Sequence, residues 1–408
     1  MNIKAHSKKQ TTIDIIYLII GAWVFAFMLS TSMLSVNQIA GNILGITFIS
    51  IRLLLIGLTF IDFLHRRQSM KRILILVLFT ALVLIEYLVA DNWLLFELFF
   101  IFIFWADRLN YIKVIKIFMY TTGFSIVLIV LLYYCGFLIK YDYFTNRMGR
   151  ARVTLGFHHP NSLSECLMVV LLCAFLLYWK KKKRVGIAIA TILVTVWIAI
   201  FPNTLTVVLT IPIVYCIFAL LKLITSKTIT KKQRRRILIL VGLFVIGIIY
   251  GLYYVVNSGM FDNSVLRQFE SLYIRIRLSR LGLERYGITL FGTVYESATE
   301  IAVYINKTAS EYFTIDSVYF LLPIRYGLIS SIVFLYCYYK SITFCVKKDN
   351  LKLLSVLIAV LVMSVVDPFV TNYIMSFIFI CSKAYKQSHG LKDKVMCDGT
   401  IGVISESR

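Results

Sequence analysis

Acidic side chains, prolines and histidines are scarce in this chain of 408 residues, which has 20 Asp and Glu, 5 Pro and 5 His. Only 15% of the residues are charged, against about a quarter in soluble globular proteins. This shortage of charge excludes an ordinary soluble enzyme and a disordered chain. The eight cysteines lie mostly within apolar runs and show no CxxC spacing, so we expect neither a disulfide framework nor a cysteine-based metal site.

Long apolar runs dominate the sequence instead. Hydrophobic residues make up 60% of the chain, and the mean hydropathy is +0.83. Runs of about 20 apolar residues match the thickness of a bilayer's hydrocarbon core. The sequence therefore predicts an all-α, polytopic integral membrane protein with about twelve spans, at 12–35, 40–64, 72–90, 92–106, 114–139, 161–179, 185–201, 204–224, 237–256, 317–340, 351–367 and 369–383.

The distribution of basic residues predicts the orientation. Of the 43 Lys and Arg, 31 fall on the segments that are inner if the basic N-terminus is cytoplasmic, as the positive-inside rule requires. The net charge of +23 is thus a sign of membrane topology and not of nucleic-acid binding. We expect both termini in the cytoplasm, a single membrane domain at 1–382 and a cytoplasmic tail at 383–408.

Two outer segments are longer than simple connections. Residues 140–160 link the fifth and sixth predicted spans, and residues 257–316 form the one long external loop. Within that loop, 264–287 places apolar residues at steps of three and four with arginines between them, which predicts a basic amphipathic helix at the membrane interface. Long ordered loops are usually functional.

The outer basic residues also differ in kind from the inner ones. On inner segments Lys outnumbers Arg 22 to 9, whereas on outer segments Arg outnumbers Lys 8 to 2. Only Arg presents a planar fork for bidentate contact with phosphate oxygens. Anchoring to lipid headgroups is the simpler explanation, and the more specific hypothesis is a phosphorylated ligand held on the outer face.

His158 and His159 supply the only imidazoles of the predicted outer segments, immediately before Pro160 and Asn161. Proline is tolerated in a first helical turn, so both histidines are expected just above the start of a span. Histidine suits proton transfer near neutral pH. Three nearby arginines would repel a divalent cation and attract an anion, so no metal site is expected: Arg147, Arg150 and Arg152.

Charged residues also occur inside the predicted spans, where each needs a partner or a cavity. Arg52 has three glutamates as alternative partners, and the sequence does not choose among them: Glu86, Glu97 and Glu165. Glu165 lies one helical turn after Asn161 and faces the same way. Such acids are also typical of proton-coupled transporters, which keeps that class open.

Three short segments carry a resemblance to a known family: Arg150–Asn161, Ser279–Gly292 and Asp316–Leu328. The first is similar to the "R…GF-x-HPN" segment of Wzy-type repeat-unit polysaccharide polymerases. The second is similar to that family's "SGR…lfG" segment, although the Gly between Ser and Arg is missing here, and the third to its "DN-x-Y…YG" segment, with Ser in place of Asn. Their order and the twelve-span layout resemble the O-antigen ligase superfamily, to which these polymerases are related, from about residue 10 to 385.

The resemblance implies a GT-C-like helical fold and an enzyme, a glycosyltransferase that joins polyprenyl-diphosphate-linked oligosaccharides into capsular or exopolysaccharide. It implies a site on the outer face of a bacterial cytoplasmic membrane and no metal or other cofactor. Carried over to this chain, it makes His159 the candidate base, with His158 as its substitute. The candidate diphosphate ligands are Arg150, Arg152 and Arg280, and Asp316 and Glu165 would position the acceptor or support an arginine.

The expected partners are the lipid-linked donor and acceptor, membrane lipid, and other capsule-assembly membrane proteins such as a flippase or a chain-length regulator. Two alternatives stay open at this point. An O-antigen-ligase-like glycan transferase shares the outer-loop architecture. A lipid-linked oligosaccharide flippase or other transporter often has about twelve spans, but it typically shows internal repeats, and no matching halves are found in this sequence. A dolichol-sugar transferase is disfavoured because the first outer loop, 35–38, lacks acids.

Overall fold

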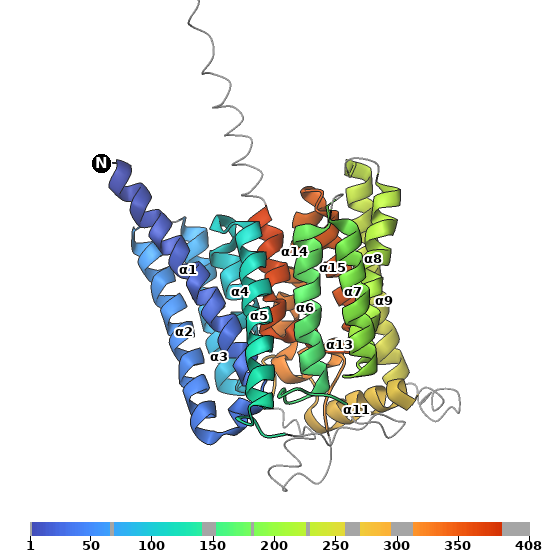
Figure 1. Ribbon diagram of the computed structural model, residues 1–408. Coiled ribbons are helices and arrows are strands. Elements are labelled where there is room, and N and C mark those ends of the chain that lie inside the picture. The colour runs from blue at the N-terminus through green and yellow to red at the C-terminus, as the bar shows by residue number, and fades with distance from the viewer. Residues whose placement is uncertain are drawn as a thin grey trace, which may run out of the picture.

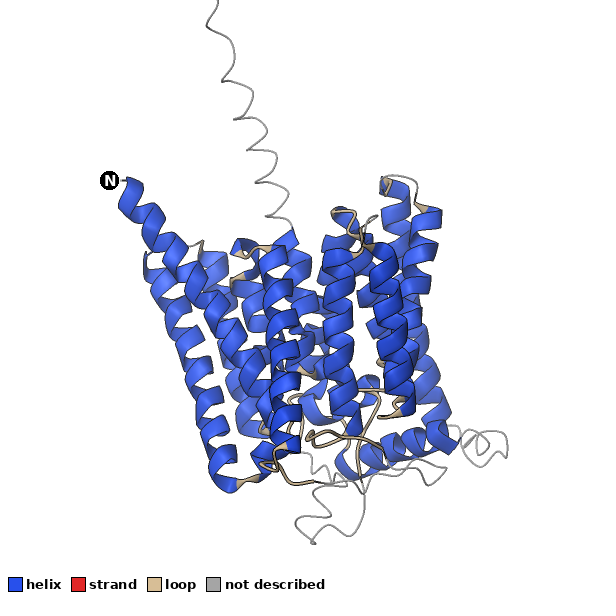
Figure 2. Cartoon of the chain, in the orientation of Figure 1, coloured by secondary structure: helices blue, strands red, loops and turns tan. Residues whose placement is uncertain are grey.

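The computed structural model describes residues 2–65, 69–140, 152–180, 183–225, 229–257, 270–294 and 313–385. Every regular element of this part of the chain is helical (Figure 2). The first half contains α1 (Asn2–Ser30), η1 (Met33–Val36), α2 (Gln38–His65), α3 (Met70–Ala90), α4 (Leu94–Phe104), η2 (Ala106–Arg108), α5 (Tyr111–Tyr134) and α6 (Pro160–Tyr178).

The second half begins with three helices that stand beside α6 and ends with elements that return to the middle of the bundle (Figure 1). They are α7 (Arg184–Ile200), α8 (Leu205–Ile224), α9 (Lys231–Asn257), α11 (Glu270–Tyr286), α13 (Val318–Leu321), η4 (Leu322–Tyr326), α14 (Gly327–Lys347), α15 (Leu351–Met363), η5 (Phe369–Thr371), η6 (Tyr373–Met375) and a last helix over Tyr373–Tyr385.

Eight of these helices are long and apolar enough to cross a membrane, which confirms the prediction of a polytopic, all-helical membrane protein. Each of the other predicted spans also contains helix, but α4, α7, α15 and the last helix have only 11, 17, 13 and 13 residues. Twelve crossings therefore remain a prediction. The last helix continues to Tyr385, three residues into the expected tail, and 386–408 lie outside the described residues.

The bundle has two ends, which we name by what lies there. α1 begins at the N-terminal side, and α11 lies across the opposite end, which we call the loop side (Figure 1). The C-terminal helices form the centre: two thirds of the most apolar stretch of Val318–Lys347 is buried, against 6% for Lys231–Val256. Trp23 of α1 stacks on Tyr373 with ring centroids 4.5 Å apart, so the first and last helices share one core.

The amphipathic helix expected at 264–287 is confirmed over its described part as α11, while 264–269 lie outside the described residues. Ile276, Ser279 and Gly282 are its inner positions at steps of three, and the packing at Gly282 is tight because an added Cβ would meet Ile315 at 2.5 Å. Arg277 and Arg280 are exposed. α11 thus covers the loop side of the bundle with one polar and one inward face.

Candidate functional site on the loop side

The histidine pair is held by a tight turn that follows Arg152. Leu155 and Gly156 both have left-handed backbones, with φ of 47° and 86°. The positive φ at Gly156 strongly favours glycine, and an added Cβ would also crowd the side chains of Leu138 and Tyr133 at 2.8 and 3.1 Å. The turn is tied to the α1–α2 connection, because the N–H of Met33 donates to the Gly156 carbonyl (2.8 Å) and that of His158 to the Thr31 carbonyl (3.0 Å).

The two histidines have different roles in this arrangement. Nε2 of His158 lies 2.9 Å from Oγ of Ser35, so its ring is bound to the connection between α1 and α2. His159 is the N-cap of α6, where its Nδ1 accepts the backbone N–H of Asn161 at 3.1 Å. An accepting Nδ1 carries no hydrogen, so the proton of a neutral His159 ring is on Nε2.

Both rings are held in the neutral form. Burial, together with the nearby positive charge of Arg152, lowers the pKa of His159 to about 3. Burial also lowers the pKa of His158, with a backbone hydrogen bond at Ser32 opposing the shift. At neutral pH, His159 is therefore an uncharged ring whose hydrogen-bond donor is the Nε2–H.

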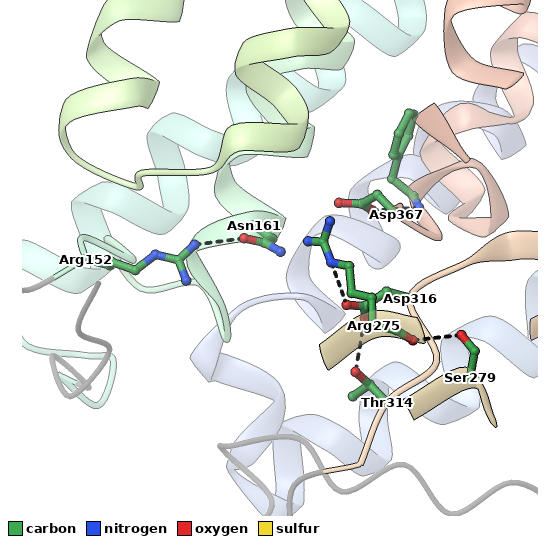
Figure 3. Close-up of polar contacts among 8 residues, drawn as sticks. Arg152, Asn161, Arg275, Ser279, Thr314, Asp316 and Asp367 are labelled. Carbon is green, nitrogen blue, oxygen red and sulfur yellow. Dashed lines mark hydrogen bonds and ion pairs between the residues drawn. The ribbon is translucent and has the colours of Figure 1, made fainter. Parts of the chain in front are cut away.

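Arg152 connects this turn to two other elements. Its Nε donates to the Pro202 carbonyl between α7 and α8 at 2.8 Å, and its Nη2 donates to Oδ1 of Asn161 at 2.9 Å (Figure 3). Arg152 and His159, both predicted site residues, are thus brought together at the first turn of α6. Arg150 lies outside the described residues.

A second arginine reaches the same region from α11. Nε of Arg275 lies 3.1 Å from Oδ2 of Asp316, and Oδ1 of Asp316 accepts the hydroxyl of Thr314 at 3.1 Å. Figure 3 shows the Arg275 guanidinium directed toward the space between Asn161 and Asp367. Asp316 was predicted, whereas Arg275 was not chosen from the sequence. The signal in the sequence is that Arg275 lies four residues before Ser279, on the same face of the helix. The buried hydroxyl of Ser279 donates to the Arg275 carbonyl at 2.9 Å.

Asp367 and Asn372 lie in the connection between α15 and the last helix, and neither was selected from the sequence. Asp367 is 4% exposed, and its Oδ1 accepts the N–H of Phe369 at 3.0 Å. The Nδ2 of Asn372 donates to Oε2 of Glu165 at 2.7 Å, which places this predicted residue beside the same connection. Asp367 is recognisable in the sequence only as an acid directly after an apolar run and before a proline.

The two aspartates of this cluster have raised pKa values. Burial raises the pKa of Asp367 to about 6, an effect that Arg275 opposes and the negative charge of Asp316 reinforces. Burial also raises the pKa of Asp316, with Arg275 and Thr314 opposing. We call the residues gathered here the polar cluster: Arg152, His159, Asn161, Glu165, Arg275, Asp316, Asp367 and Asn372.

Arg280, the third predicted arginine, is placed on the outer face of α11. Its side chain is 48% exposed and its Nε lies 2.8 Å from Oε1 of Glu284, one turn further on. An exposed pair of this kind is weak and leaves the guanidinium at the surface. The structure therefore brings Arg275, not Arg280, to the polar cluster.

The second and third motif segments meet in space. The N–H groups of Leu328 and Ile329 open α14 and donate to the carbonyls of Thr289 and Leu290 at 3.0 and 3.1 Å. Gly292 and Gly327 are in backbone contact, both with left-handed φ, so neither tolerates a Cβ. The segment after α11 thus caps α14 and fixes the position of α11 over the bundle.

An apolar cavity of about 370 Å³ lies between α5, α6 and α7 beside this cluster. Leu155 of the histidine turn is part of its wall, and Leu163 lies one turn after His159. The rest of the lining is also hydrophobic: Ile126, Val130, Leu167, Leu193, Val194 and Trp197. A polar cluster with two arginines and an apolar cavity between the helices α5, α6 and α7 are thus neighbours.

The arrangement can bind an anion through Arg152 and Arg275, donate a hydrogen bond through His159 and accept a proton on Asp367. Comparison of the chain with protein-family models, curated proteins and solved structures gives no match.

Proposed function

We propose that this protein is a polymerase that joins polyprenyl-diphosphate-linked oligosaccharide units on the loop side, which would then face away from the cytoplasm. The observation that carries the proposal is the polar cluster, in which two arginines, a neutral histidine donor and a buried aspartate from α6, α11 and the α15 connection converge. A diphosphate needs cationic donors, and an attacking hydroxyl needs a base. The GFHHPN and YG segments, which resemble those of Wzy-type polymerases, lie at or beside this cluster.

The adjoining apolar cavity supports a lipid-linked substrate. A polyprenyl chain is a branched hydrocarbon, and the walls at Leu155, Leu163 and Trp197 offer it a surface of the same polarity. With the first isoprene units in this cavity, the diphosphate would come next to Arg152. An aqueous sugar substrate alone would give no reason for an apolar cavity beside the cluster.

The reaction assigns each residue a role. A hydroxyl oxygen of the acceptor unit attacks the anomeric carbon of the donor, the carbon–oxygen bond to the diphosphate breaks, and polyprenyl diphosphate leaves. Arg152 and Arg275 stabilise the negative charge that grows on the leaving oxygen, an effect commonly of about 2.7–4 kcal/mol per donor. The Nε2–H of His159 donates to the same diphosphate.

Asp367 is the group that we assign to accept the hydroxyl proton. With its pKa raised to about 6, its carboxylate is largely ionised at pH 7 and more basic than an ordinary aspartate. The predicted base was His159, and that role remains a prediction. The occupied Nδ1 of His159 favours Asp367 instead.

Reconstitution tests the proposal directly. The purified chain in liposomes, given one lipid-linked repeat unit, is expected to yield a ladder of longer lipid-linked products without nucleotide or divalent metal. Arg275→Gln should remove the ladder, whereas Arg277→Gln, on the exposed face of the same helix, should retain it.

The same assay separates the alternatives. A ligase-like transferase would move one glycan onto a different acceptor and form no ladder. A flippase or other transporter would move the lipid-linked unit across the membrane without forming a glycosidic bond, which a dye-quenching or lectin-accessibility assay on the same liposomes detects.

A further inference from the structure

A second, larger cavity lies at the opposite end of the bundle, between the start of α9 and the end of α14. Its volume is about 840 Å³. Both helices meet on the N-terminal side, where the N–H of Ile229 donates to Oδ1 of Asp349 at 3.0 Å. The lining divides into a basic part (Lys231, Arg234, Arg235 and Lys347) and a part formed by Leu238, Ile239, Gly242, Tyr339 and Val346.

The basic part carries much more positive charge than its surroundings neutralise. Arg234 has an acidic partner, Asp349, at 3.6 Å. Within the described ranges no carboxylate pairs with Lys231, Arg235 or Lys347. Three cations from α9 and α14 therefore line one cavity without a counter-charge from the described chain, which favours an anionic occupant.

The apolar part extends from these charges into the membrane. Gly242 lies eleven positions after Lys231 in α9, which is roughly 16 Å along a helix axis. α9 is also poorly covered, since only 6% of its most apolar stretch is buried. Along its apolar part such a gap suits hydrocarbon better than water, which finds no polar partners on these side chains.

We propose that the cavity between α9 and α14 binds an anionic phospholipid, with its phosphate against Lys231, Arg235 and Lys347 and one acyl chain along Leu238, Ile239 and Gly242. Basic pockets between membrane helices are a recurrent site for phosphate headgroups. The lipid would join α9 to the bundle and so position α11, which follows α9 and carries Arg275. The proposal concerns lipid binding alone and does not depend on the reaction at the polar cluster.

Native mass spectrometry of the full chain with phosphatidylglycerol and phosphatidylcholine tests the site. Arg235→Gln with Lys347→Gln should weaken phosphatidylglycerol binding by roughly 25-fold, at about fivefold for each charge. The control pair is Lys116→Gln with Lys222→Gln, which removes the same charge from exposed positions outside the cavity and should change binding by less than about twofold.

Gly242→Phe tests the acyl chain separately. Gly242 lines the cavity and an added Cβ there meets nothing within 4 Å, so a larger side chain starts in open space, and the substitution changes none of the four basic residues. It should lower phosphatidylglycerol binding about as much as the double charge variant. Equal affinity for both lipids, equal loss in the control pair, or full displacement by soluble glycerol phosphate would each overturn the proposal, the last by showing a site for a free phosphate ester.

Discussion

Nδ1 of His159 accepts the backbone N–H of Asn161 at 3.1 Å, so the ring atom that would take a proton from substrate already caps α6. The pKa of this histidine, lowered to about 3 by burial and by Arg152, keeps the ring neutral throughout the physiological range. His159 therefore caps α6 through Nδ1 and, in the proposed reaction, donates to the substrate through Nε2–H. Its structural and functional contributions can be separated by substitution.

His159→Asn is expected to keep the cap and to lose the imidazole Nε2–H, which the shorter asparagine amide does not replace at the same position. Asparagine is among the best N-cap residues, so the melting temperature should stay near that of the parent, whereas His159→Ala should cost about 1 kcal/mol of stability. Both variants should lose polymer formation because neither carries the Nε2–H. Thermal unfolding in detergent and the product ladder measure the two effects. An active His159→Asn protein would leave the cap as the residue's only role.

Arg275→Lys should reduce polymer formation by about 100-fold or more, because it keeps the charge but loses the fork that contacts Asp316 and the proposed diphosphate. Arg280→Lys is the matched change five residues along the same helix, in an exposed pair with Glu284, and should be nearly silent. Rates of ladder formation at equal protein levels compare them. The reverse result would return the diphosphate contact to Arg280, as its motif position predicts.

Asp367→Asn should abolish the acidic limb of the pH–rate profile. In the parent, activity should rise with pH through about 6 as the carboxylate ionises, and then level off. His159 does not account for such a limb, because its pKa lies near 3. A parent profile flat between pH 5 and 7, or an unchanged limb in the residual activity of Asp367→Asn, would remove Asp367 as the base.

The same substitution has a second expected effect, on stability. Because folding raises the pKa of Asp367 from 3.8 to about 6, its contribution to stability is present below pH 4 and is lost as the pH rises through 6. At pH 7 the folded protein therefore holds an unfavourable buried charge, and Asp367→Asn should stabilise it. Unfolding at pH 4.5 and pH 7.5 should show the gain mainly at the higher pH.

The sequence predicted the features that follow from composition and periodicity. Apolar runs indicated the spans, and the step of three and four placed the amphipathic helix now seen as α11. These patterns did not predict contacts between segments that are far apart in the sequence. Arg275 and Arg280 look equivalent along the chain, and only packing of Ser279 and Gly282 against the bundle turns Arg275 inward.

The role of Asp367 also could not be predicted from the sequence. Its neighbours along the chain, an apolar run before it and a proline after it, do not distinguish it from other acids at a helix end. Its raised pKa arises from burial and from the negative charge of Asp316, and the positive charge of Arg275 opposes the shift; the tertiary fold brings all of these groups to it. His159 was identified by its type, but its tautomer depends on a hydrogen bond that only the helix start reveals.

Cysteine labelling should establish the orientation, which rests on the charge asymmetry alone. In a background without native cysteines, Leu290→Cys on the loop side should react with an impermeant reagent in intact cells. Lys348→Cys, at the N-terminal end of the bundle, should react only after the membrane is opened. Both positions are exposed, so accessibility of the side chain does not differ between them. The opposite pattern would place the polar cluster in the cytoplasm.

The pairing of Arg52 with Glu97 predicts strong energetic coupling inside the membrane domain. Their side chains meet at 2.5 Å, and the Arg52 guanidinium lies 4.7 Å from the centroid of the Trp93 ring, so Glu97 is the partner that the sequence left open among three glutamates. Arg52→Leu alone should cost about 3–5 kcal/mol, because it leaves the Glu97 carboxylate uncompensated. Adding Glu97→Leu should recover most of that loss, since two apolar side chains suit the site better than one charge. Unfolding of the two single variants and the double variant in mild detergent gives the coupling energy, and additive losses would show that the two charges are solvated independently.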